Sequence, residues 1–594
     1  MDNNSNTSRF ILATLLSAGI LLGFQYFYAP KQPAQPPAQP AGQLAQHPGA
    51  PAPALTNVAA STPALVRPAA DVVKATLAQR LPFEGPDVKG TFNLVGARLD
   101  DLTLTHYRQT TSPQSPLVRL LRPAGTPHPN YVVLGWDGMP GHSHELPGPE
   151  SRWQVEGAPG QVLTPEHPVT LSWDNGRGAT FHIHLALDKQ YMFSVRQSVD
   201  NATTSAPLYV RPFQRVERDY LPADTGSMTA YEGPIGVMNG HLEDAGYKKL
   251  RKNSDNPAHI AWEATGHGGW VGITDKYWLT AVAAPAQSLV TASYGYVMPP
   301  GAYLATMAGH DIMEIAPGAT LGADSHVFAG AKVASILNGY SKQLQVPGFE
   351  KAIDFGWFSY LTKPIFWLLH WLYSVIGNFG LALMAMTLVV KLILFPLAYK
   401  AAVSAGRMRL LAPRIKAIKE RNKDDPAAAQ MQMMALYREE KVNPAGGCLP
   451  VLIQAPIFFC LYKVLNISID ARQAPFFGWI HDLSEPDPTN ALNLFGLLPF
   501  NPAHYATFLH VSLWGAALGL TFWLLQRQTQ MVMDPSQQKV MRFMPLVYVF
   551  IMTSFPASLL VYYTWNNILT FMQQYVIERH AKLPKALPPE PEKG

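Results

Sequence analysis

One long apolar run decides the fold class. The run is F379-G-L-A-L-M-A-M-T-L-V-V-K-L-I-L-F-P-L-A-Y399, and its one ionisable residue is Lys391. As a helix rising ~1.5 Å per residue it covers about 30 Å, enough to cross a bilayer core. A charge in hydrocarbon costs roughly 3 kcal/mol even on insertion scales. The run therefore predicts a membrane-crossing helix in which the lysine has a specific reason to be present.

Further apolar runs extend this prediction to a multi-pass α-helical membrane protein. Crossing helices are expected at 379–399, 445–465, 507–526, 543–555 and 557–577. The N-terminal run 10–28 ends in Tyr26-Phe27-Tyr28 and lacks an A-x-A site, so segment 1–29 is expected to be an uncleaved anchor, with a cleaved signal peptide as the alternative. Six transmembrane helices result, and five of them form a core over 377–580. The aromatic segment 355–376 is expected to be an amphipathic helix in the membrane interface.

The part of the chain between the anchor and the core is polar. Segment 30–74 is rich in Pro, Ala and Gln and is expected to be a flexible linker. Residues 75–350 show short alternating runs, including two strands around the Asn-Gly turn in 169–187 and another strand at 191–199. A large antiparallel β-sandwich is predicted there.

The loop charges predict the orientation of the chain. Loop 400–442 carries a net charge of +5, loop 467–505 carries −3 and loop 527–542 carries +2. Positively charged loops stay in the cytoplasm, so both termini, including the tail 581–594, are expected there. The β-domain is then periplasmic in a bacterium with an outer membrane.

Loop 400–442 is itself expected to form a cytoplasmic helical hairpin. Its first arm is 404–421, and its second arm, 427–441, follows Asp425 as a cap and Pro426 at the first helical position. A solvated hairpin without special function is one interpretation, and an adaptable binding surface or membrane contact is the other. For the second interpretation the candidate contact residues are Arg407, Arg409, Arg414, Met431 and Met434.

Polar residues in the expected membrane helices suggest a hydrated groove. Thr387 lies four residues before Lys391 and shares its helix face, and Pro396 permits a bend. The last helix carries a polar stripe that should not face lipid. The expected groove residues are Lys391, Thr387, Gln454, Tyr562, Tyr563, Asn566, Asn567 and Thr570. Contact between helices is the alternative role of the amides, and snorkelling is the alternative for Lys391.

Other candidate chemistries receive little support. The two cysteines, Cys448 and Cys460, would lie about 18 Å apart on one helix, too far for a disulfide. The pair His182 and His184 and the segment H142-S-H-E145 contain metal-binding residue types, but no third ligand follows at a fixed spacing. The sequence contains no catalytic or nucleotide-binding motif, so no enzyme activity, metal, cofactor or nucleic-acid partner is expected.

Several motifs resemble one known family, the YidC membrane protein insertases of the YidC/Oxa/Alb superfamily. The core motifs are N443-P-A-G-G-C-L-P-V-L-I-Q-A-P-I-F-F-C-L-Y462, R472-Q-A-P-F-F-G-W-I-H-D-L483, M541-R-F-M-P-L546 and F555-P-A-S-L-L-V-Y-Y563. Two further motifs, G268-G-W-V-G-I-T-D-K-Y277 and D354-F-G-W-F-S-Y-L-T-K-P364, resemble the Gram-negative form with a large periplasmic domain.

The resemblance implies an ATP-free insertase and chaperone of the inner membrane that works alone or with the Sec translocon. Its implied partners are nascent membrane proteins and lipids, with the ribosome and the signal recognition machinery as further candidates. The groove cation of the family is commonly Arg and aligns with Lys391, while the groove Thr aligns with Thr387 and the paired tyrosines with Tyr562 and Tyr563. Lysine keeps the charge but lacks the bidentate fork of arginine.

Two other functions fit parts of the sequence. A secondary transporter would also place polar groups at the membrane midplane, but it predicts acidic relays or inverted repeats, and neither occurs here. An anchored periplasmic sugar-binding or sugar-processing protein would leave the C-terminal helices unexplained. Membrane protein insertion is the function that the sequence favours.

Overall fold

The structure is a computed structural model that describes residues 66–580 with several gaps. The gaps are 140–145, 203–206, 223–229, 300, 357, 424, 441, 443–448, 497–510, 529–534 and 554. The expected N-terminal anchor, nearly all of the linker and the C-terminal tail therefore lie outside the described residues. The same holds for Cys448 and for the segment 142–145.

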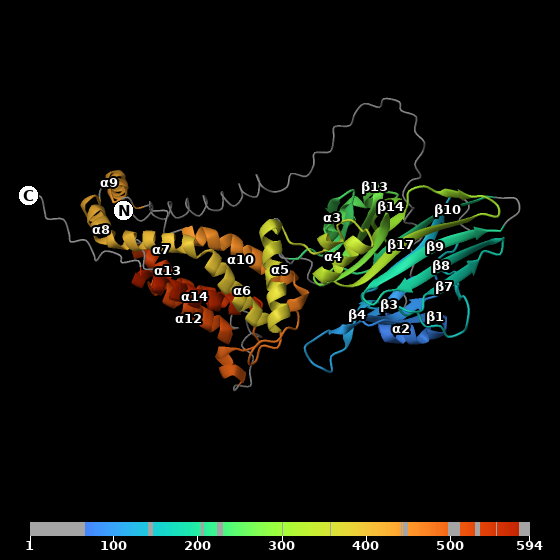
Figure 1. The fold of residues 1–594 in the computed structure, drawn as a ribbon, viewed down its shortest axis with the longest axis horizontal. Helices are drawn as coiled ribbons and strands as arrows, with labels where there is room; N and C mark the ends of the chain where they lie inside the picture. The colour runs from blue at the N-terminus through green and yellow to red at the C-terminus, as the bar shows by residue number, and fades with distance from the viewer. Residues whose placement is uncertain are drawn as a thin grey trace, which may run out of the picture. The chain divides into compact units, whose positions relative to one another are not determined.

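Residues 80–331 form an all-antiparallel β-domain, as expected (Figure 1). The strands are β1 Arg80–Glu84, β2 Val88–Asn93, β3 Arg98–Arg108, β4 Leu117–Leu121, β5 Asn130–Gly138, β6 Gln154–Val155, β7 Val169–Asp174, β8 Ala179–Leu187, β9 Met192–Asn201, β10 Leu208–Arg218, β11 Gly233–Met238, β12 His241–Asp244, β13 Ile260–Thr274, β14 Trp278–Val297, β15 Ala302–Gly309, β16 Met313–Ile315 and β17 Thr320–Ala331. Hydrogen bonds link them into one continuous network over a shared hydrophobic core.

The predicted hairpin illustrates how the sequence pattern builds this domain. Strands β7 and β8 pair from Val169–Leu185 to Asp174–Thr180, and β9 pairs with β8 in turn. Along β8 buried and more exposed residues alternate, because successive side chains of a strand point to opposite faces. The turn between β7 and β8 contains Gly176 and Gly178 at φ of 68° and 91°, a conformation that glycine adopts without strain.

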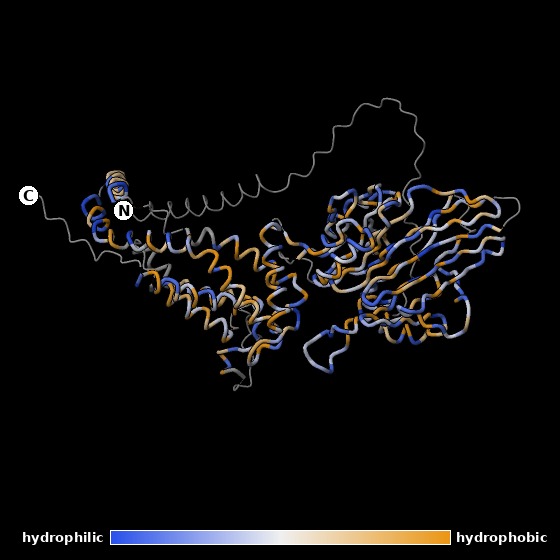
Figure 2. Tube along the Cα trace, in the orientation of Figure 1, coloured by the Kyte–Doolittle hydropathy of each residue, from blue (hydrophilic) through white to orange (hydrophobic). Residues whose placement is uncertain are grey.

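Helices dominate the rest of the chain. Three helices accompany the β-domain: α2 Ala69–Ala75, α3 Tyr247–Asn253 and α4 Ala334–Gln343. The later helices are α5 Ser359–Ile376, α6 Phe379–Ile393, α7 Phe395–Leu410, α8 Ala412–Arg421, α9 Pro426–Glu439, α10 Leu449–Ile467, α12 Leu513–Gln528, α13 Pro535–Met552 and α14 Ala557–His580. In Figure 2 hydrophobic residues form long stretches on α6 and α10, whereas α14 mixes hydrophobic and hydrophilic residues and the strands alternate between the two.

The boundary between α5 and α6 follows local sequence signals. Gly377 ends α5 in the left-handed conformation at φ 76°, where glycine is favoured. The side chain of Asn378 then caps α6 by accepting a hydrogen bond from the backbone N–H of Leu381 at 3.0 Å. Gly377 therefore ends α5, which is rich in aromatic residues, and Asn378 begins α6, which carries Lys391.

Two expected helices are each broken in the structure. The run 379–399 divides into α6 and α7 at Leu394, because Pro396 lacks the N–H that would continue the helical ladder. The expected hairpin arm 404–421 is helical but interrupted at one residue: α7 ends at Leu410 and α8 begins at Ala412, with Pro413 in its first turn. Taken singly, none of the described helices combines the length and apolar composition of a membrane span, but α6 and residues 395–408 do so as a pair bent by 64°.

Candidate functional site

Lys391 lies on the side of α6 that faces α14. Its Nζ donates a hydrogen bond to Thr570 Oγ1 at 2.6 Å, and the side chain is half-buried. Within the described residues no carboxylate lies within ion-pair distance of this ammonium group. The structure therefore joins two of the expected groove residues directly and leaves the positive charge without a protein counter-charge among the residues that it describes.

Thr387 occupies a different environment from Lys391, although it shares the helix face. Its side chain is 2 % exposed, and its hydroxyl donates to the carbonyl of Leu383 on its own helix at 2.7 Å. This i to i−4 bond satisfies the hydroxyl without any partner on α10 or α14. Thr387 is thus buried in the helix packing and forms no hydrogen bond with Lys391.

A second polar contact joins α10 to α14. Gln454 Nε2 donates to the hydroxyl of Tyr562 at 3.1 Å, and Tyr562 is fully buried. Tyr562, Asn566 and Thr570 are spaced four residues apart, so they lie on one face of α14. The Thr570 hydroxyl also donates to the backbone carbonyl of Asn566 at 2.6 Å. This row brings the contacts from α6 and α10 onto the same face of one helix.

The neighbouring polar residues of α14 contact two different helices, α12 and α10. Asn567 donates to Thr521 Oγ1 on α12 at 3.3 Å, and the ring of Tyr563 lies 5.4 Å from that of Phe458. Of the polar residues expected to face Lys391, the structure joins Thr570 to it directly, and the lining of a cavity by these residues stays a prediction. Asn567 instead connects two helices, which was the alternative role considered for the amides.

The structure adds a contact between α6 and α14 that the sequence pattern did not reveal. Trp565 Nε1 donates to the backbone carbonyl of Met384 on α6 at 3.1 Å. A tryptophan in an apolar helix gives no sequence signal for such a bond, because the acceptor is a backbone atom 181 residues away. This bond ties α14 to α6 about two helical turns from Lys391.

The helical pair α8–α9 carries most of the expected contact residues outside the groove. Asp425 caps α9 as predicted, with Oδ1 accepting from the amides of Ala427 and Ala428 at 3.0 Å. Arg414 pairs with Glu440 at 3.0 Å, which ties α8 to the end of α9. The two helices enclose a small apolar cluster formed by Leu411, Ile415, Leu436 and Val442.

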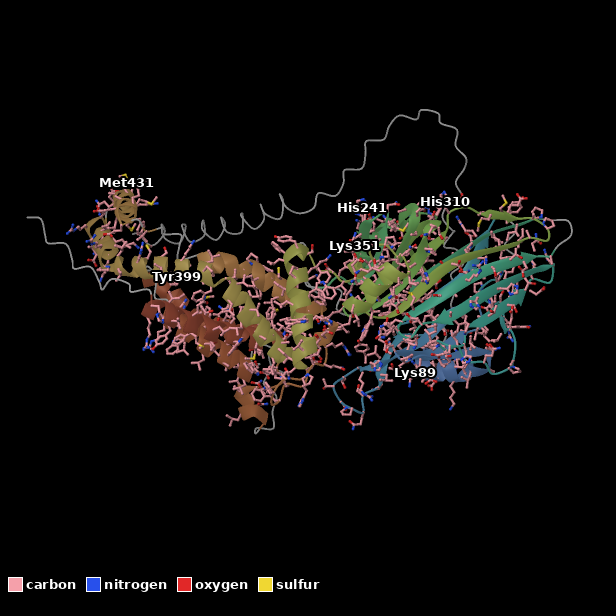
Figure 3. The ribbon with its side chains drawn as sticks, viewed as in Figure 1. Lys89, His241, His310, Lys351, Tyr399 and Met431 are labelled. Atoms are coloured by element: carbon pink, nitrogen blue, oxygen red, sulfur yellow. The ribbon has the colours of Figure 1, made fainter. Side chains whose placement is uncertain are left out.

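The methionines of α7 and α9 divide into two groups. Met408 and Met433 pack against the apolar cluster, whereas Met431 and Met434 are 72 % and 49 % exposed. Figure 3 labels Met431 on α9. Arg407 is exposed as well, and the side chain of Arg409 lies outside the described residues. Exposed thioether side chains on α9 are therefore available for contact.

Two ion pairs join α5 and the segment before it to α10 and the segment after it. His370 Nδ1 on α5 lies 2.8 Å from Asp470 Oδ2, while Trp367 and Trp371 on the same helix remain 42 % and 59 % exposed. Lys463 near the end of α10 pairs with Asp354. The carboxylate lies 109 residues away in sequence, so the sequence pattern gives no indication of this pair.

The metal interpretation of the β-domain histidines gains no support. His182 lies 2.7 Å from Glu156 and 3.2 Å from Asp200, and His184 bonds to the hydroxyl of Thr170 at 3.0 Å. Among the residues that the structure describes, no group of three or more His, Cys, Asp or Glu side chains is placed to hold a metal ion.

Comparison with known proteins assigns both halves of the chain. The "60Kd inner membrane protein" family matches residues 371–585, and the "YidC periplasmic domain" family matches residues 80–368. Residues 80–368 therefore correspond to a periplasmic domain, and the helical part corresponds to an inner-membrane core.

Individual relatives give the same result over nearly the full length. The membrane protein insertase YidC of Granulibacter bethesdensis is 45 % identical over 580 residues, which cover 97 % of this chain and 98 % of that protein. The same protein of Acidiphilium cryptum is 48 % identical over 84 % of both chains. A crystal structure of an active YidC insertase aligns with 84 % of this chain and 92 % of its own, at 18 % identity and a TM-score of 0.34. The sequence identities show that the chain belongs to the YidC family of membrane protein insertases.

Proposed function

We propose that the chain inserts nascent membrane proteins through the polar face shared by α6, α10 and α14, without ATP or another cofactor. The observation that carries the proposal is the environment of Lys391. Its ammonium group is half-buried, is held by Thr570 and has no carboxylate partner among the described residues. A desolvated charge is stabilised by a counter-charge, and a passing acidic segment supplies one.

The electrostatics of this arrangement favour transfer of short hydrophilic segments. A carboxylate of the client that comes within about 6 Å of Lys391 gains roughly 3 kcal/mol at an effective dielectric constant near 20. Hydration of the polar row on α14 shortens the low-dielectric path that the segment must cross. The site thus lowers the barrier to transfer by attraction, and it needs no covalent chemistry.

The apolar surface beside Lys391 provides the exit. Leu388, Leu392 and Ile393 on α6 are 44 %, 63 % and 71 % exposed. Such residues suit contact with lipid or with an apolar client helix. Once the hydrophilic segment has crossed, the hydrophobic segment moves sideways into lipid because burial of apolar surface is favourable.

The proposed topology has six transmembrane helices, with both termini and the α8–α9 pair in the cytoplasm and the β-domain in the periplasm. The charge of loop 400–442 and the exposed Met431 and Met434 support this placement. Arg407, Arg409 and Arg414 are the proposed contacts for a client, a ribosome or targeting machinery, and the Sec translocon is the proposed partner in the membrane. The aromatic face of α5 lies in the outer interface.

Site-specific photocrosslinking tests the groove. A photoreactive residue at 391 or 570 is expected to crosslink to a stalled nascent membrane protein, whereas one at 521 on the α12 side is not. Crosslinks from 391 to lipid alone would contradict the groove and support snorkelling. Equal client crosslinks from all three positions would contradict the specific path.

A further inference from the structure

The first four strands of the β-domain carry a polar face opposite their core face. Leu81, Phe83, Val88, Leu102 and Leu104 are buried in the hydrophobic core. Residues of the opposite face meet in cross-strand register, with Glu84 opposite Lys89, Lys89 opposite Thr103, Thr91 opposite Asp101 and Thr103 opposite Arg119. Directly opposed residues of antiparallel strands share a face. Charged and hydroxyl side chains from all four strands are therefore gathered on one surface.

These residues line an open pocket of about 310 Å³. Phe83 and Gly90, which belong to the core face, border the pocket between the polar residues, and a Cβ at Gly90 would lie 2.0 Å from the carbonyl oxygen of Asp101, so only glycine fits there. Lys89 is labelled on these strands in Figure 3. The volume lies at the lower end of the range of about 300–1,000 Å³ that is typical of small-molecule sites.

A β-bulge places two neighbouring carboxylates on this face. Thr91 is opposite Asp101, but the next residue of β2, Phe92, is opposite Leu99, so Asp100 is the extra residue. Asp100 is fully partnered: it forms a bidentate pair with Arg80 at 2.5 and 3.2 Å and accepts a hydrogen bond from Asn93. Asp100 therefore has a structural role that its neighbour does not share.

Asp101 is the unusual member of the pair. It is 4 % exposed and lines the pocket, and its Oδ2 accepts a hydrogen bond from Thr91 at 2.9 Å. Its Oδ1 is enclosed and receives no hydrogen bond within the described residues, but it forms an ion pair with Arg119 Nε at 3.4 Å. Burial raises the pKa of Asp101, although Arg119 and Thr91 oppose that shift. Arg119 therefore compensates Oδ1, whereas Oδ2 accepts among the described residues only from Thr91 and keeps a lone pair for a donor on a ligand.

The rest of the wall defines the complementary ligand. Glu84 and Asp101 face Lys89 and Arg119, so the formal charges of the lining balance. The side chains of Glu84, Lys89 and Thr103 form no hydrogen bond or ion pair with other described residues. An anion would be repelled by the carboxylates and a cation by the basic groups. Adjacent hydroxyl groups suit the site, because each can donate to Asp101 and accept from Arg119.

From this geometry we propose that the β-domain binds a neutral polyhydroxylated molecule the size of a mono- or disaccharide in the pocket between β1 and β4. Asp101 accepts from its hydroxyl groups, and Arg119 and Lys89 donate to them. The site is independent of the groove residues on α6, α10 and α14, so it adds a ligand-binding role to the periplasmic domain of the insertase.

The proposal is tested on the full chain in lipid nanodiscs, because a maltoside detergent would compete for the pocket. Saturation-transfer-difference NMR with glucose, N-acetylglucosamine and maltose is expected to show binding of at least one sugar. Asp101→Asn is expected to weaken that binding about ten-fold or more, since it replaces a charged acceptor. Thr103→Tyr, which fills the pocket from its open side, is expected to abolish it.

The matched control is Asp324→Asn. Asp324 also pairs with an arginine across two strands, Arg196 at 3.1 Å, but it lies on the exposed surface outside the pocket. It is expected to leave binding unchanged. The proposal is overturned if none of the three sugars binds the wild type, or if binding survives in both pocket variants. Binding of the zwitterion glycylglycine in place of the sugars would also overturn it.

Discussion

Replacing Thr570 with valine tests the contact that directs Lys391 toward α14. The variant removes a hydroxyl that accepts from the lysine at 2.6 Å and donates to the carbonyl of Asn566. A hydrogen bond to a charged group contributes about 1.5–3 kcal/mol. For a unit of the size of the helical core, this corresponds to a fall in melting temperature of roughly 3–12 °C.

Thr387→Val is the matched control for this variant. Its hydroxyl makes the same bond to the carbonyl four residues earlier, at 2.7 Å, but it does not contact the lysine. Its loss is expected to cost less than about 1 kcal/mol. The difference between the two variants therefore isolates the contribution of the lysine contact.

The chain contains a suitable reporter for the measurement. Cys460 on α10 is 1 % exposed, so it reacts with a fluorogenic maleimide only when the helical part unfolds. A Cys448→Ser background removes the other thiol, and the β-domain contains no cysteine, so its unfolding gives no maleimide signal. Thr570→Val is expected to expose Cys460 at a clearly lower temperature than Thr387→Val. Equal shifts in the two variants would refute the reasoning about Lys391.

Three further predictions concern other parts of the chain. Burial and the negative charge of Glu217 raise the pKa of Asp219 from 3.8 to about 7. Between pH 4 and 7 the folded state therefore keeps a proton that the unfolded state has lost, and the free energy of unfolding falls as the pH rises through this range. Asp219→Asn should stabilise the β-domain by on the order of 3 kcal/mol at pH 8 and hardly at all at pH 4 in calorimetry; equal effects at both values would contradict this. A double-mutant cycle of Gln454→Leu and Tyr562→Phe should give a coupling of about 0.5–1.5 kcal/mol, and additive losses would exclude the bond as a stabilising contact. Deletion of most of 80–340 should spare insertion in reconstituted vesicles, because the groove residues lie elsewhere; an inactive deletion that still folds in the membrane would overturn it.

The sequence predicted those features that depend on neighbouring residues. The bend at Pro396, the cap at Asp425 and the hairpin in 169–187 follow from local backbone chemistry, and all three are present. The antiparallel β-domain followed from repeated alternation and turn signals. These features need no knowledge of distant parts of the chain.

Contacts between distant segments could not be predicted in the same way. Spacing shows that Tyr562, Asn566 and Thr570 share a face of a helix, but the rotation of that helix against its neighbours is set by packing. Asn567, which was expected to face Lys391, therefore donates a hydrogen bond to Thr521 on α12. For the same reason the partner of Lys463 was missed, since Asp354 lies before α5.

The most direct test of the groove compares the insertion activity of four proteins that differ only at position 391. Wild type, Lys391→Arg, Lys391→Gln and Lys391→Glu are reconstituted in vesicles with clients whose translocated segment is either acidic or neutral. Lys391→Arg should retain insertion, and Lys391→Gln should slow the acidic client up to about 100-fold, from roughly 3 kcal/mol of lost attraction. Lys391→Glu should abolish insertion of the acidic client and leave the neutral one much less affected. Equal insertion of the acidic client by wild type and Lys391→Glu would contradict the role of the positive charge.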